Sequence, residues 1–151
     1  MKKQILRSLV VAMVISVFSL SSLALPFERS IEGTWRTSVT QFNCQTGTAM
    51  EPFPGILTFN KGGTLVGTSS TVTTAFGIWQ AVRGSQNYNF AFTNLRYDPS
   101  GVVIGSQIVR QAVTLDASGD GFTSTGTAQF LDLNGNVVGN GCARSVGTRF
   151  E

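Results

Sequence analysis

The feature that most constrains the fold is a regular alternation, from Gly33 onward, between two kinds of segment. Short runs rich in Val, Ile, Thr, Phe and Tyr are separated by clusters of Gly, Asn, Asp, Ser and Pro, a pattern typical of an all-β domain. The runs predict eight strands, at residues 33–43, 55–60, 64–72, 76–83, 87–97, 102–115, 121–131 and 136–150. The short turn-forming connections between them predict successive antiparallel hairpins.

Within the predicted strands, alternate residues separate into an aromatic face and a polar face. Tyr88, Phe90 and Phe92 share one side of their strand, and Phe122, Gly126, Ala128 and Phe130 share one side of another, opposite a row of threonines. Strands with a single apolar face have to close on themselves or pack as two sheets. Small residues on the inferred inner face, Gly67, Gly126 and Ala128, favour an interior cavity.

The first 24 residues have the pattern of a cleaved signal peptide. Lys2, Lys3 and Arg7 precede an apolar stretch, and Ser22-Leu23-Ala24 supplies the small residues of a cleavage site. This pattern predicts export, leaving residues 25–151 as one soluble domain in the periplasm or outside the cell. An uncleaved anchor is the alternative. Three of the eleven basic residues lie in the leader, so the mature chain has eight basic and eight acidic residues, scattered singly. We therefore expect no nucleic-acid partner and no stable membrane insertion of the mature domain.

Cys44 and Cys142 are the two cysteines of the chain, and both lie in the exported part. Thiols oxidise outside the cytoplasm, so we expect a disulfide, with two buried free thiols as the alternative. Cys44 follows the first predicted strand and Cys142 lies in the last. In an up-and-down barrel of eight strands those two strands are neighbours, so we expect a closed antiparallel barrel, with a two-sheet sandwich as the alternative.

Gly33-Thr34-Trp35 opens the first predicted strand, and Gly147-Thr148-Arg149-Phe150 ends the last. This pair of motifs resembles the calycin pattern, and lipocalins most. The resemblance implies that Gly33 opens the first strand and that Trp35 plugs one end of the barrel. It also implies that Arg149 packs across the Trp35 side chain. The alternative is that Trp35 is an ordinary core residue with the Arg149 cation stacked on its ring, which implies stability alone. No Thr-Asp-Tyr motif lies between the middle strands, and avidin-like and cyclase-type barrels remain alternatives.

Few residues of the mature chain suit common catalytic or metal sites. His is absent, Lys61 is the single Lys after the leader, and the four Asp residues fall in predicted turns. Residues 116–121 match the first half of a calcium loop, but Thr127 stands where that loop needs Glu. We therefore expect no metal, no cofactor and no catalytic residues. Glu51, in the long connection 45–54, is the one carboxylate placed to overhang a barrel mouth.

The preferred function is binding of a small, mostly apolar molecule inside the barrel. The sequence nominates the ligand-binding residues Trp79, Tyr88, Phe90, Phe92, Arg110 and Phe122, with Arg110 as an inward anchor or, alternatively, a solvated outward residue. A second hypothesis is a cyclase or isomerase that uses Tyr88, Tyr97 or Glu51. A third is a structural or inhibitory domain with a filled barrel, and a fourth is an outer-membrane barrel. The sequence leaves the oligomeric state open.

Overall fold

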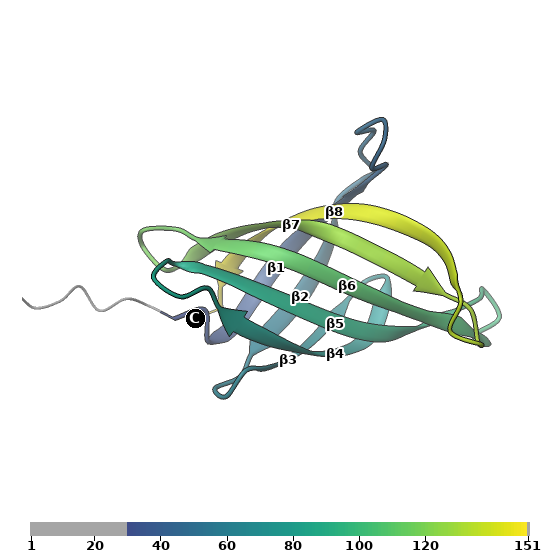
Figure 1. Cartoon of the computed structure of the whole chain (residues 1–151), viewed down its shortest axis with the longest axis horizontal. Helices are drawn as coiled ribbons and strands as arrows, with labels where there is room; N and C mark the ends of the chain where they lie inside the picture. The colour runs from purple at the N-terminus through teal and green to yellow at the C-terminus, as the bar shows by residue number, and fades with distance from the viewer. Residues whose placement is uncertain (1–29, 151) are drawn as a thin grey trace, which may run out of the picture.

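The computed structural model describes residues 30–150 as a closed barrel of eight antiparallel strands in chain order (Figure 1). The strands are β1 (Gly33–Phe42), β2 (Phe53–Phe59), β3 (Thr64–Ser69), β4 (Val72–Ala81), β5 (Asn87–Tyr97), β6 (Val103–Leu115), β7 (Gly121–Leu131) and β8 (Val137–Arg149). The predicted fold class, strand number and meander order are confirmed. The predicted signal peptide lies outside the described residues. Within them there is no helix long and apolar enough to cross a membrane.

Closure of the barrel depends on pairing between β1 and β8. The two strands run antiparallel from the pair Trp35–Arg149 to the pair Phe42–Cys142. Just beyond this ladder Cys44 is bonded to Cys142, with their Cα atoms 5.3 Å apart. The predicted disulfide is therefore present, and it joins the terminal strands of a barrel rather than two sheets of a sandwich.

Two strands begin earlier than the sequence predicts. β4 starts at Val72, four residues before its expected start, because Ser70 and Thr71 turn tightly and the β-branched residues after them extend directly. β2 starts at Phe53, and Pro54 occupies the beginning of that strand, where proline is tolerated. The connection from β1 to β2, residues 43–52, is the longest between consecutive strands, and in Figure 1 it projects away from the barrel rather than across its end.

The inner face carries the core at one end of the barrel. The buried cluster is centred on Trp35, Phe59 and Phe122, all at most 2% exposed. Its rings meet edge to face, with centroids 5.0 Å apart for Trp35 and Phe122 and 6.3 Å apart for Phe59 and Phe122. Gly147 makes room for the Phe122 ring, which a Cβ at that position would overlap. The aromatic face inferred from the strand alternation thus faces inward.

Candidate ligand-binding cavity

One end of the barrel is closed by Trp35 and Arg149. Trp35 is fully buried and donates its Nε1 hydrogen to the carbonyl oxygen of Ile31 at 2.8 Å. The guanidinium carbon of Arg149 lies 4.3 Å from the centroid of the indole ring. Gly33 has φ of 120°, and a Cβ there would come within 3.0 Å of the Arg149 guanidinium. Gly33 therefore permits both the strand entry and the close approach of the cation.

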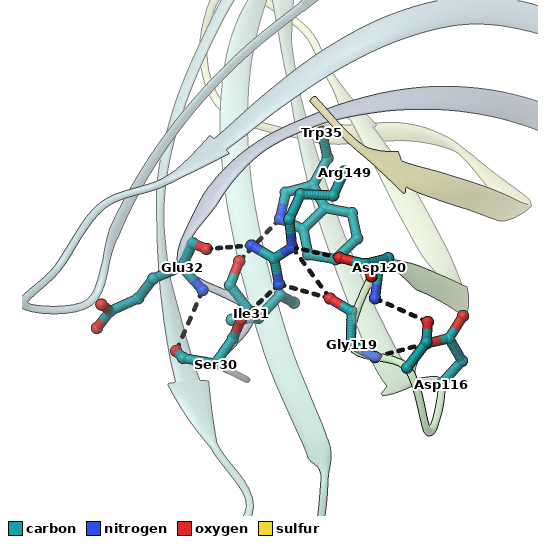
Figure 2. A network of polar contacts seen from close by, with 9 residues as sticks. Ser30, Ile31, Glu32, Trp35, Asp116, Gly119, Asp120 and Arg149 are labelled. Atoms are coloured by element: carbon teal, nitrogen blue, oxygen red, sulfur yellow. Dashed lines mark hydrogen bonds and ion pairs between the residues drawn. The ribbon is translucent and has the colours of Figure 1, made fainter. Parts of the chain in front are cut away.

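The Arg149 guanidinium is held by backbone carbonyl groups from two segments (Figure 2). It donates to the carbonyl oxygens of Glu32 at 2.7 Å, Ser30 at 2.9 Å and Gly119 at 2.7 and 3.0 Å. Its Nε also lies 3.5 Å from a carboxylate oxygen of Asp120. These contacts tie the segment before β1 to the β6–β7 turn, so this end of the barrel is sealed.

The other half of the barrel contains a cavity of about 350 Å³. Its walls are inner-face side chains, and its rim includes Asn43, Met50 and Thr71 from the β1–β2 and β3–β4 connections. The cavity therefore opens at the end opposite Trp35. Its volume lies at the lower end of the range for small-molecule sites, about 300–1,000 Å³.

Most of the cavity wall is apolar. Leu57, Phe90, Phe92, Val109 and Phe130 contribute large side chains from four different strands. Small residues on the same wall, Gly67, Ala128 and Ala143, leave the volume unfilled. Gly67 and Ala128 are residues for which the sequence pattern predicted this role.

A polar cluster lies at the boundary between the cavity and the packed core. The Ser124 hydroxyl donates to the Gln111 Oε1 atom, and the Ser145 hydroxyl lies within hydrogen-bond distance of both the Ser124 hydroxyl and, at 3.4 Å, the same Gln111 oxygen. All three residues are at most 7% exposed. Gln111 and Ser145 line the cavity, whereas Val113, two residues beyond Gln111 on β6, belongs to the core. The cluster therefore forms the polar part of the cavity floor.

The cavity wall is electrically neutral. Every side chain lining it in the described part of the chain is apolar, hydroxyl or carboxamide, and Cys142 is committed to the disulfide. Arg96 is on the inner face of β5, but it stacks over Phe130 at 5.1 Å from the ring centroid and does not line the cavity. Asn94, also inward and buried, has an Oδ1 atom without a hydrogen-bond partner among residues 30–150, and it too lies outside the cavity wall.

The residues nominated from sequence are divided between three places. Phe90 and Phe92 line the cavity. Tyr88 and Phe122 lie in the packed core, and Trp79 packs against it, donating its Nε1 hydrogen to the Asn60 carbonyl oxygen at 2.9 Å. Arg110 is on the outer face, where its guanidinium donates to Gln129 at 3.0 Å. Arg110 therefore has the outward position that the sequence left open as an alternative, and it does not reach the cavity.

Several residues that line the cavity are not among those nominated from the sequence. Gln107, Val109 and Gln111 alternate along β6 with outward residues, as Phe130 does with its neighbours on β7. The strand also carries apolar residues on its outer face, such as Ile104, so its pattern alone does not distinguish the faces. The pattern therefore does not predict that the polar residues Gln107 and Gln111 face inward.

The acidic and phenolic candidates lie away from the cavity. Glu51 and Tyr97 are exposed, and neither lines it. Asp116 and Asp132 are in turns, where hydrogen bonds from the Ser118 hydroxyl and from the Asn136 side chain, respectively, are the largest causes that lower the pKa of each carboxyl. In the described residues no three His, Cys, Asp or Glu side chains are grouped as a metal site.

The fold and the cavity define the class as a closed eight-stranded antiparallel β-barrel with a plugged end and an interior cavity at the opposite end. No protein-family model, curated protein or solved structure matches the chain. The functional argument therefore depends on the site itself.

Proposed function

We propose that this protein is an extracytoplasmic, lipocalin-like barrel that binds a small, mostly apolar molecule in its interior. The observation that carries the proposal is the cavity of about 350 Å³ bounded by Phe90, Phe92 and Phe130. Concave, largely apolar sites with a few polar groups are the usual form of small-molecule sites. The sealed Trp35 end leaves a single mouth for entry and release.

An extracytoplasmic location agrees with two features of different origin. The leader predicts export, and the Cys44–Cys142 disulfide is compatible with an oxidising compartment. The cyclase hypothesis gains no specific support, because Tyr88 is in the core while Tyr97 and Glu51 are outside the cavity. A completely filled barrel does not agree with the cavity.

The direct test is titration of the purified domain, residues 25–151, with the uncharged fluorescent probe N-phenyl-1-naphthylamine. We expect saturable binding to the wild-type domain. Replacing Ala128 by Phe puts a ring into the cavity and is expected to weaken binding by about tenfold or more. Thr127→Phe, the neighbouring exposed position on the outer face, is the matched control and should bind as wild type does.

Overfilling a barrel can also destabilise it, so a second variant removes volume instead. Phe92→Leu keeps an apolar wall but loses ring contacts, and it should weaken probe binding by a few fold. Circular dichroism and urea unfolding verify that each variant is folded. Absence of saturable binding by the folded wild-type domain, or equal binding by wild type and Ala128→Phe, would overturn the proposal.

A further inference from the structure

The Gln111 side chain offers a hydrogen-bond donor to a ligand at the cavity floor. Gln111 Oε1 is engaged by the hydroxyl groups of Ser124 and Ser145, which also contact each other. Among residues 30–150 no bond is formed by the Gln111 amide NH₂ group, and Gln111 lines the cavity. The serine contacts therefore fix the carboxamide through its oxygen, and its NH₂ group can donate a hydrogen bond to a ligand in the cavity.

The surroundings of Gln111 place this donor at the inner end of the cavity. Gln111 pairs with Phe90 on β5 and with Gly126 on β7. A Cβ at position 126 would come within 2.7 Å of the Gln111 Cα atom and 1.9 Å of the Arg110 carbonyl oxygen, so glycine is required beside the glutamine. Beyond Gln111 along β6, Val113 and Leu115 are in the packed core. A ligand that reaches the floor therefore meets Gln111 and can go no deeper.

The neutral wall determines which ligands can be desolvated there. A carboxylate or ammonium group that leaves water without a partner of opposite charge carries a large desolvation penalty. Among residues 30–150, neither an acidic nor a basic side chain lines this cavity. A carbonyl or ether oxygen, by contrast, loses its hydration at small cost if one N–H group replaces it.

From these observations we infer that the ligand is an uncharged, mostly apolar molecule with one hydrogen-bond-accepting oxygen, which the Gln111 amide group receives at the floor of the cavity. This inference rests on the proposed function, because it specifies the ligand class of the same site. It also accounts for the outward position of Arg110, since a neutral ligand needs no cationic anchor.

The test compares two ten-carbon compounds that differ in their polar group, each displacing N-phenyl-1-naphthylamine from the wild-type domain at pH 7.5. 2-Decanone is neutral and accepts one hydrogen bond, whereas decanoate is an anion at this pH. We expect 2-decanone to displace the probe at about tenfold lower concentration than decanoate. Equal potency, or higher potency of decanoate, would overturn the inference.

Matched glutamine variants then test the donor itself. Gln111→Met keeps a flexible side chain of similar length and should weaken 2-decanone displacement by about tenfold, with probe binding retained as evidence of an intact cavity. Gln80→Met changes an exposed glutamine on the outer face of β4, which does not line the cavity, and should have less than about a twofold effect. Equal effects of the two substitutions would reject Gln111 as the anchor.

The outcomes separate this inference from the proposed function. If neither the probe nor 2-decanone binds, the binding function itself fails. If the probe binds and decanoate is preferred, the function stands and the neutral-ligand inference fails. Arg96→Gln then identifies the cause, because loss of decanoate binding in that variant would assign the anion to the guanidinium stacked on Phe130.

Discussion

At the residue scale, Arg149 shows how one side chain can seal a barrel end. Each of its three guanidinium nitrogens donates to a backbone carbonyl group, and its plane covers Trp35, while the side chain remains 23% exposed. A planar cation with several fixed donors suits this site, whereas a lysine offers a single charged point. Arg149 therefore stabilises the seal mainly through hydrogen-bond geometry and stacking.

Arg149→Lys is expected to lower the free energy of unfolding by about 2 kcal/mol, because most of the charge-assisted bonds to the carbonyl groups and the stacking are lost. Urea unfolding followed by tryptophan fluorescence measures the change. Arg144→Lys, at an exposed position of the same strand, should change stability by less than about 0.5 kcal/mol. Wild-type stability in Arg149→Lys would contradict the structural role given to the guanidinium.

At the scale of elements, aspartates organise the hairpin turns. Asp132 Oδ1 accepts hydrogen bonds from the backbone N–H groups of Asn134 and Asn136, both at 2.9 Å, and Oδ2 accepts from the Asn136 side chain at 3.0 Å. Asp116 accepts from Ser118 Oγ at 2.7 Å and from the backbone N–H of Gly119 at 2.8 Å. These bonds favour the ionised carboxylates, so the pKa of both groups is lowered from 3.8.

A carboxyl group with a lower pKa in the folded than in the unfolded chain stabilises the fold above the unfolded pKa. This contribution is lost as the pH falls below about 3.8 and through the folded value. We therefore expect wild type to be more stable than Asp132→Asn at pH 6, with the difference shrinking as the pH is lowered to 2. Thermal unfolding at a series of pH values measures this difference.

Glu51→Gln, in the exposed β1–β2 connection, is the control for that series. Its stability relative to wild type should change less with pH than that of Asp132→Asn. A constant difference between wild type and Asp132→Asn over the whole pH series would show that the carboxylate charge does not stabilise its turn.

At the scale of the whole molecule, two kinds of bond close the barrel. The β1–β8 ladder joins the terminal strands through backbone pairing, and the disulfide joins them covalently across a sequence separation of 98 residues. A cross-link over a loop of this length restricts the unfolded chain strongly, by about 4–5 kcal/mol in the chain-entropy model. The disulfide should therefore affect stability more than it affects the folded shape.

The double variant Cys44→Ala/Cys142→Ala is expected to lose about 2–5 kcal/mol of stability while its far-UV circular dichroism spectrum and probe binding are retained. Chemical unfolding of the oxidised wild type and of the variant measures the loss. Adding reductant should destabilise wild type to a similar extent and leave the double variant unchanged. Loss of the β-sheet spectrum in the variant would show instead that the ladder needs the bridge to close.

The local features of this protein could be predicted from its sequence because they depend on neighbouring residues alone. Strand alternation has a period of two, and turn chemistry acts within a few residues, so the eight strands and the turns containing Asp98, Asp116 and Asp132 could be located. The pairing of Cys44 with Cys142 was predicted from the signal-peptide pattern, and closure of the barrel was predicted from that pairing.

The tertiary structure alone determines how deep each side chain lies along the barrel axis and whether it faces the interior or the solvent. Trp79 and Phe92 look equivalent in the sequence, and both pack against the core, yet only Phe92 also lines the cavity. Arg110 lies in a strand with apolar residues on both faces, so pairing with both neighbouring strands was needed to turn it outward. The neutral wall around Gln111 arises from side chains of several strands that become neighbours when the barrel closes, a relation that no local pattern contains.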